Sequence, residues 1–138
     1  MTAPTPNAEL MWRVLDQIDA YPELWDQGYW FTVTDCGTAA CVAGWACLLS
    51  GDKPFPLLGK LEDLPVGEQV SYVDVQGWTR LARVRAQELL GITEDQADAL
   101  FHYENTRDVL GRLVAEIFGP RPKAIAAAYK LDTGKAGR

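Results

Sequence analysis

The sequence lacks the long apolar runs from which membrane-spanning helices are built. Its longest apolar stretch, residues 39–49, is far shorter than the roughly 20 residues that cross a bilayer. The chain does not open with a basic region followed by an apolar segment, and no lipidation signal is evident, so we expect no secretory signal peptide and no anchor. These absences predict a cytoplasmic protein that contacts no membrane.

Cysteine and histidine are both scarce. The three cysteines, Cys36, Cys41 and Cys47, lie within twelve residues, and His102 is the single histidine. An odd number of cysteines in a chain without a signal peptide indicates free thiols rather than disulfides. No Cys-x-x-Cys knuckle is present, and Cys41 and Cys47 would point about 120° apart on a helix. We therefore expect no metal site and no cofactor.

Sequence motifs of common enzyme classes are missing as well. The chain has no phosphate loop, no dinucleotide glycine pattern and no nucleophile elbow. One catalytic hypothesis remains, because Cys36 is predicted just ahead of a helix N-terminus, where the helix dipole favours a thiolate. His102 is then the available base. In the competing interpretation Cys36 and Cys41 are small apolar fillers beside Gly44, where another backbone packs closely.

Positive charge is scarce over most of the chain. Residues 1–119 hold eight Lys and Arg against eighteen Asp and Glu, whereas residues 120–138 hold five against one. An acidic body repels the phosphates of nucleic acids, so we do not expect nucleic acid as a partner. The basic tail either contacts an acidic partner or is a solvated end that aids solubility.

Apolar and aromatic residues, by contrast, are plentiful. They make up 48% of the 138 residues, enough for one compact domain with its own core. We predict a single helical domain over residues 1–119. The tail, residues 120–138, is expected to form a short helix around residues 124–131 and then to be disordered.

Apolar spacing and capping residues predict four to five helices. The first begins at Asn7, and an almost wholly apolar helix over residues 39–49, capped by Thr38, is expected at the centre of the core. Further helices are predicted over residues 78–90, from Thr93 to about Tyr103, and from Asn105 to Phe118; Gly91 ends the first of these, and capping pairs Thr93–Gln96 and Asn105–Asp108 open the other two.

Strand character is confined to two segments. Residues 30–34 and 70–75 are rich in β-branched and aromatic side chains, and a turn at Gln76–Gly77 follows the second. Two strands form only a small sheet. The predicted fold class is therefore mainly α, with a small two-stranded antiparallel sheet.

Residues 78–103 resemble a helix-turn-helix, which opens the hypothesis of a DNA-binding regulator. The presumed recognition helix would begin with acidic residues, whereas DNA-reading helices present Arg, Lys, Asn or Gln. Three arginines precede this presumed recognition helix. They could contact a DNA backbone, or they could form the solvated face of an amphipathic helix. These charged residues are Glu94, Asp95, Asp98, Arg80, Arg83 and Arg85.

Aromatic residues are the most promising contacts for a partner protein. Tryptophan and tyrosine commonly anchor protein interfaces, and a small protein with more aromatic surface than its core absorbs exposes a binding patch. The candidate binding residues are Trp25, Tyr29, Trp30 and Trp78.

One segment has a distinctive motif, Cys36-Gly37-Thr38-x-x-Cys41-x-x-Gly44-Trp45-Ala46. Together with Tyr21-Pro22-Glu23-x-Trp25-Asp26-Gln27 and the stretch from Ala86 to Phe101, it resembles small proteins of actinobacteria and their phages. The resemblance covers roughly residues 8–118 and implies an actinobacterial or phage origin. It brings no established activity, so no residue roles transfer. Where relatives have His before the proline, this chain has Tyr21, which weakens any role for a histidine there.

Taken with the missing catalytic motifs, these features predict a non-enzymatic protein-binding accessory factor. It would be encoded by a phage or mobile element and would act on a host protein. Two alternatives stay open: a thiol-dependent enzyme or redox-sensitive factor using Cys36, and a DNA-binding regulator acting through residues 78–103.

Overall fold

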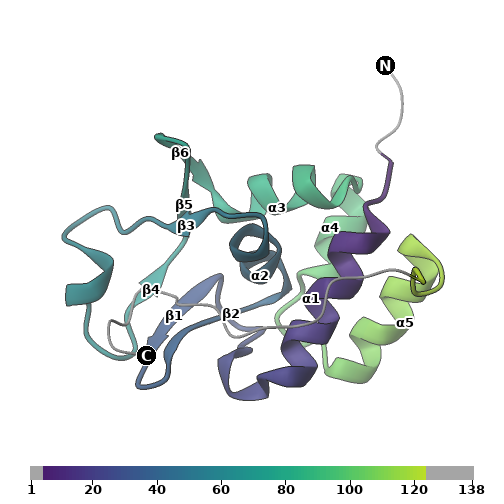
Figure 1. The fold of residues 1–138 in the computed structure, drawn as a ribbon, viewed down its shortest axis with the longest axis horizontal. Coiled ribbons are helices and arrows are strands. Elements are labelled where there is room, and N and C mark those ends of the chain that lie inside the picture. Colours follow the sequence, from purple (N-terminus) through teal and green to yellow (C-terminus); the bar gives the residue numbers. More distant parts are fainter. Residues whose placement is uncertain (1–4, 124–138) are drawn as a thin grey trace.

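The computed structural model describes residues 5–123 of the chain and has a mixed α/β architecture. Within this range five α-helices and two short 3₁₀ helices accompany six strands (Figure 1). The helices are α1 (Ala8–Ala20), η1 (Pro22–Leu24), α2 (Val42–Leu49), η2 (Leu61–Asp63), α3 (Ala82–Leu90), α4 (Glu94–Leu100) and α5 (Arg107–Phe118). The strands are β1 (Phe31–Thr34), β2 (Gly37–Ala40), β3 (Lys53–Pro54), β4 (Gln69–Val70), β5 (Tyr72–Val75) and β6 (Trp78–Leu81).

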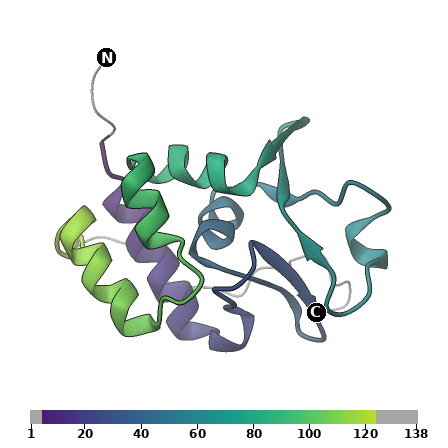
Figure 2. The same ribbon diagram turned by 180° about the vertical axis from the view of Figure 1, so that it is seen from behind.

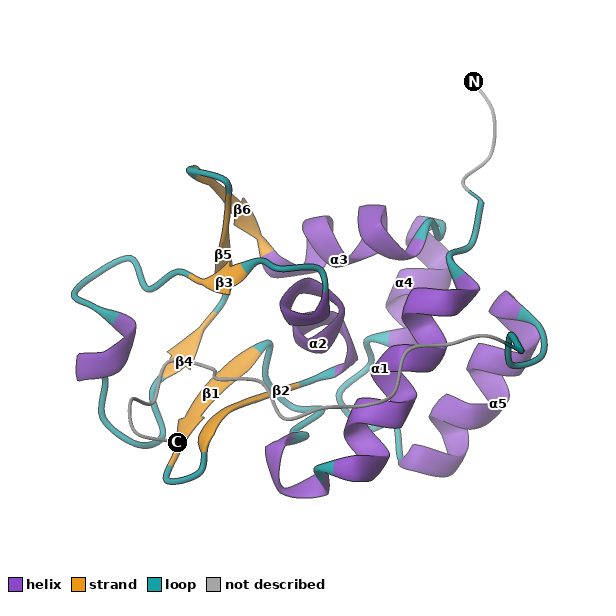
Figure 3. Ribbon diagram, in the orientation of Figure 1, coloured by secondary structure: helices purple, strands orange, loops and turns teal. Residues whose placement is uncertain are grey.

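The prediction of a mainly α fold with one two-stranded sheet is wrong. The strands form two antiparallel sheets of three strands each, in the orders β2-β1-β4 and β3-β5-β6 (Figure 3). The two predicted strands do pair, since Phe31 lies opposite Val70. Each recruits further neighbours, β2, β3 and β6, from segments for which no strand was predicted.

The two sheets share one stretch of chain. Only Ser71 separates β4 from β5, so residues 69–75 run from the first sheet into the second. The Ser71 carbonyl accepts a hydrogen bond from the Ala82 N–H, 2.9 Å away, at the start of α3. The junction between the sheets is therefore fixed to the helical part of the molecule.

Helix α2 lies at the centre of the domain, as predicted, and all eight of its residues are buried. It packs against α3 and α1, and Figure 1 shows it nearly end-on between the helices and the sheets. Gly44 explains how closely it packs. A β-carbon at this position would overlap the Trp30 carbonyl oxygen and lie 2.7 Å from the Ala40 β-carbon.

Helix α2 is shorter than predicted at its start. Residues 37–40 are strand β2, paired with β1, and Cys41 instead of Thr38 is the N-cap. The alanines of this segment suit a helix by propensity, but antiparallel pairing with Phe31–Thr34 outweighs that local preference.

Helix α3 is shortened in the same way. Residues 78–81 are strand β6, and the helix begins only at Ala82. Gln76 and Gly77 form the predicted turn, with φ values of 53° and 92° that join β5 and β6 as a tight hairpin. The turn prediction is confirmed, whereas the first four residues of the helix predicted directly after it form a strand.

The other predicted helix starts agree with the structure except at one cap, and α4 ends at Leu100, three residues before the predicted end at Tyr103. The Asn7 side chain accepts from the Leu10 N–H, and the capping box at Thr93 is complete. Thr106 caps α5 in place of Asn105. The Asn105 amide instead donates to the Ala99 and Leu100 carbonyls at the end of α4, at 2.8 and 3.0 Å. The helix predicted around residues 124–131 lies outside the described residues, as does most of the tail.

A single apolar core joins the helices and sheets, and it draws residues from α1 through α5. No helix within residues 5–123 combines the length and apolar character needed to cross a membrane.

Candidate functional site

The three thiols lie in very different surroundings. Cys36 is exposed in the turn between β1 and β2, where its N–H donates to the Thr34 Oγ1 at 3.2 Å. It does not precede a helix, so the predicted activation by a helix dipole is wrong. Cys41 and Cys47 are buried. Burial raises the pKa of the Cys41 thiol to about 11 and also raises that of Cys47, so both remain protonated at neutral pH.

The structure does not bring the candidate base to the candidate nucleophile. His102 follows α4 and stacks on Tyr103, and its neighbour Phe101 meets Trp30 edge to face at 6.2 Å. Trp30 lies at the opposite end of β1 from the Cys36 turn, and a four-residue strand spans roughly 10 Å or more. The His102 Nδ1 accepts from the Glu104 N–H at 3.1 Å. Cys36 and His102 do not form a catalytic pair in this geometry.

The cysteine-rich motif is structural in this fold. Gly37 has a φ of 129° in the hairpin, Cys41 caps α2, and Gly44 allows the close approach to Trp30. Trp45 is buried, and its indole N–H donates to the Leu24 carbonyl at 2.9 Å. These four positions of the motif are therefore accounted for by packing, hairpin geometry or the N-cap position of α2.

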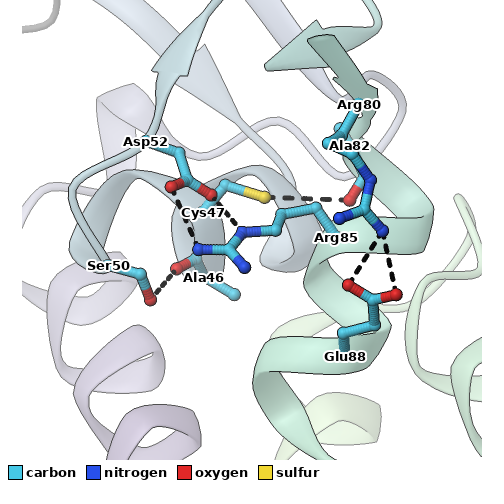
Figure 4. A network of polar contacts seen from close by, with 8 residues as sticks. All are labelled: Ala46, Cys47, Ser50, Asp52, Arg80, Ala82, Arg85 and Glu88. Carbon is cyan, nitrogen blue, oxygen red and sulfur yellow. Dashed lines mark hydrogen bonds and ion pairs between the residues drawn. The ribbon is translucent and has the colours of Figure 1, made fainter. Parts of the chain in front are cut away.

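The arginines of the supposed helix-turn-helix are already neutralised by carboxylates. Arg85 binds the buried Asp52 with Nε 2.7 Å from Oδ2, and this hydrogen bond raises the arginine pKa (Figure 4). Arg80 holds both oxygens of Glu88, at 2.9 and 2.8 Å. The third arginine, Arg83, bridges Glu94 and Asp98 on α4. These ion pairs tie β6, α3 and α4 together and leave little positive charge for a DNA backbone.

Gln27 is a buried polar residue to which the sequence motif assigned no role. Its Oε1 accepts from the Trp25 indole at 3.0 Å and from the Val42 N–H at 3.3 Å. Its amide donates to the carbonyls of Leu100 and His102, at 3.2 and 3.1 Å. One side chain thereby joins the segment after η1, the first turn of α2 and the end of α4.

The four aromatic binding candidates divide into two groups. Trp25 and Trp30 are half-buried against the core and serve mainly in packing. Tyr29 is partly exposed, and Trp78 is 75% exposed at the tip of the β5–β6 hairpin. Trp78 is therefore the candidate with most of its surface available.

Several exposed apolar side chains lie in the segment between β3 and β4. Leu57 is 63% exposed and Leu58 86%, and Phe55 and Val66 are also exposed. Figure 2 shows this segment extending away from the helices, beyond the sheets. The clue in the sequence is Phe55-Pro56-Leu57-Leu58, because apolar residues between a proline and a glycine, outside any helix or strand, have few core neighbours.

This segment borders a groove of about 260 Å³. One wall is formed by residues 55–58 together with Leu64, and the other by residues 68–72. Strand β4 is the outermost strand of its sheet, so the groove runs along a sheet edge. We call this feature, with Leu57 and Leu58 on its rim, the edge groove.

Comparison of the chain with protein-family models, curated proteins and solved structures finds no match. The resemblance to actinobacterial and phage proteins therefore stays a prediction. Within residues 5–123, no three His, Cys, Asp or Glu side chains gather where a metal ion could bind. The candidate site thus depends on the geometry of the edge groove alone.

Proposed function

We propose that this chain is a non-enzymatic protein-binding factor and that the edge groove with its leucine rim is its interface. The observation that carries this proposal is the exposure of Leu57 and Leu58, at 63% and 86%, beside a groove at a sheet edge. Adjacent large apolar side chains at such exposure are typical of surfaces covered by a partner.

The free energy available from covering this rim is substantial. Full burial of a leucine side chain contributes about 1.5–3 kcal/mol, and because Leu57 and Leu58 are 63% and 86% exposed, covering both offers roughly 2–4.5 kcal/mol. Phe55 and Tyr72 line the groove and add aromatic surface. The separation of Cys36 from His102 and the neutralised arginines leave the thiol and DNA-binding alternatives without comparable support. The resemblance to actinobacterial and phage proteins favours a host protein as the partner.

The test is affinity capture from an actinobacterial lysate with three tagged forms of the full chain. These are the wild type, Leu57→Asp/Leu58→Asp and, as a matched control, Tyr103→Asp. Tyr103 is 66% exposed and lies after α4, away from the groove, so it is a comparable change at a different surface. Because the altered side chains are exposed, all three forms should fold, which circular dichroism checks.

We expect one stoichiometric protein with the wild type and with Tyr103→Asp, and its loss with the double variant. Binding of the purified partner, measured by calorimetry, should weaken at least tenfold in the double variant. If the double variant still captured the partner, or if Tyr103→Asp lost it, the interface would not be the edge groove. Turnover of a substrate that depends on Cys36 would replace the proposal with an enzymatic function.

A further inference from the structure

The shape of the edge groove restricts what it accepts. Its volume of about 260 Å³ is below the roughly 300–1,000 Å³ of sites that enclose drug-sized ligands. It is also small for an α-helix, whose diameter with side chains is about 10–12 Å. A groove of this size suits individual side chains of an extended chain.

The edge position of β4 supports the same occupant. Strand β4 pairs with β1 on one side and has no further strand beyond it in its sheet, within the described part of the chain. Exposed sheet edges bind extended peptides by strand addition, in which main-chain hydrogen bonds supply affinity and side-chain pockets supply specificity. The apolar wall formed by Phe55, Leu57 and Leu58 faces such a peptide along the groove.

Charge adds a preference for a basic residue. Glu68 lines the groove, and Glu62 and Asp63 lie on η2 in the segment that connects the two walls. All three carboxylates are exposed, and none is in an ion pair among residues 5–123, unlike Asp52 and Glu88. A Lys or Arg of the occupant would find a free carboxylate here.

We propose that the edge groove binds an extended segment of a partner protein that adds a strand beside β4. Its apolar side chains would pack on Phe55, Leu57 and Leu58, and a Lys or Arg would pair with Glu68. This inference rests on the proposed function, because it specifies the partner chemistry of the same surface.

The experiment is selection of a displayed library of random ten-residue peptides on the full chain. Expected winners have apolar residues at alternate positions and at least one Lys or Arg. A synthetic winner should bind the wild type and Tyr103→Asp alike, and lose at least tenfold in affinity for Leu58→Asp. Glu68→Gln should weaken it about two- to fivefold, the range for an exposed ion pair, and this loss should shrink at high salt.

Main-chain pairing is tested on the peptide itself. In an added strand, every second N–H of the peptide points toward β4. Methylating these nitrogens removes the donors and should reduce affinity at least tenfold, whereas methylating the nitrogens that point away from β4 should change affinity little. Winners with helical i, i+3, i+4 apolar spacing, acidic winners, winners indifferent to Leu58→Asp, or no winners at all would each overturn strand addition. A lysate partner that still depends on the leucine rim would then keep the proposed function and reject only this binding mode.

Discussion

Replacing either of two helical glycines by alanine should change the free energy of unfolding, but by very different amounts. Gly44 lies in α2 and Gly111 in α5, and replacing glycine by alanine inside a helix contributes about 1 kcal/mol of stability by itself. At Gly44 the new β-carbon would overlap the Trp30 carbonyl oxygen and approach the Ala40 β-carbon to 2.7 Å. Neither group can move without disturbing the β1–β2 pairing.

The expected magnitudes follow from these contacts. Forcing an extra methyl group into a packed core destabilises a protein by about 1–3 kcal/mol when its neighbours can shift. At Gly44 the neighbours are backbone and paired strands, so we expect at least the upper value. Because alanine's better helix propensity offsets about 1 kcal/mol of this cost, Gly44→Ala should lower the free energy of unfolding by about 2 kcal/mol or more. At Gly111 the β-carbon meets only the Arg107 Nη1, at 3.1 Å, on a flexible side chain. Because the exposed Arg107–Asp19 pair is worth at most about 1 kcal/mol, Gly111→Ala should be neutral to about 1 kcal/mol more stable.

Urea unfolding followed by tryptophan fluorescence measures both variants. Thermal unfolding should agree, with Gly44→Ala melting about 6 °C or more below the wild type, taking about 3–5 °C per kcal/mol for a chain of this length. An unchanged denaturant slope would assign the difference to the folded state. A Gly44→Ala protein as stable as the wild type would refute the close packing of α2 on Trp30.

Three further outcomes are expected. Gln27→Leu should lose about 1–3 kcal/mol in urea unfolding, because it leaves the buried Val42 N–H at the start of α2 without its acceptor, whereas the Leu100 and His102 carbonyls still accept from Asn105; Gln69→Leu on the surface should change little. In the native protein Cys36 should react at once with a thiol-specific disulfide reagent and Cys41 and Cys47 only after unfolding, so rapid labelling of all three would contradict their burial. Because the pKa of the Cys41 thiol rises from 9.0 to about 11 on folding, stability that is present below pH 9 should be lost as the pH rises toward 11, by up to about 1.4 kcal/mol per unit. Unfolding at pH 8.5 and 10 should show a smaller decline in Cys41→Ala than in the wild type, and equal declines would count against this linkage.

The helices that could be predicted are those with strong local signals. Helix α1 has its Asn7 cap and apolar stripe, and α4 has a complete capping box at Thr93. The central place of α2 follows from its wholly apolar sequence. In each case the residues that determine the element are neighbours in the sequence.

The missed strand β2 has no such local signal, and β6 has one only in the turn that precedes it. Strand β2 leads into α2 with Cys41 as the single intervening residue, and β6 runs directly into α3. Each has only four residues and depends on a partner strand for its conformation. A two-residue turn such as Gln76–Gly77 after a strand does indicate a hairpin, and that signal favoured a strand over the helix predicted there.

The candidate site was the least predictable part. Trp78 is exposed as the aromatic content allowed, but Trp25 and Trp30 pack against the core. Whether a side chain is exposed depends on the tertiary fold. The sequence between Phe55 and Gly67 alone does not reveal that Leu57 and Leu58 stay uncovered. The edge groove also requires the end of one sheet and a distant loop to lie together, which no local pattern encodes.

The stretch of residues 69–75 that both sheets share has a consequence for which changes in chain length the protein tolerates. Phe31 fixes the position of Val70 in one sheet, and Pro54 fixes Val73 in the other. An inserted residue at Ser71 would turn one sheet's side chains to the wrong face, because strand side chains alternate. Changes in chain length should therefore be tolerated better beside the exposed Leu57 and Leu58 than at Ser71, and there they would reshape the edge groove without altering the core.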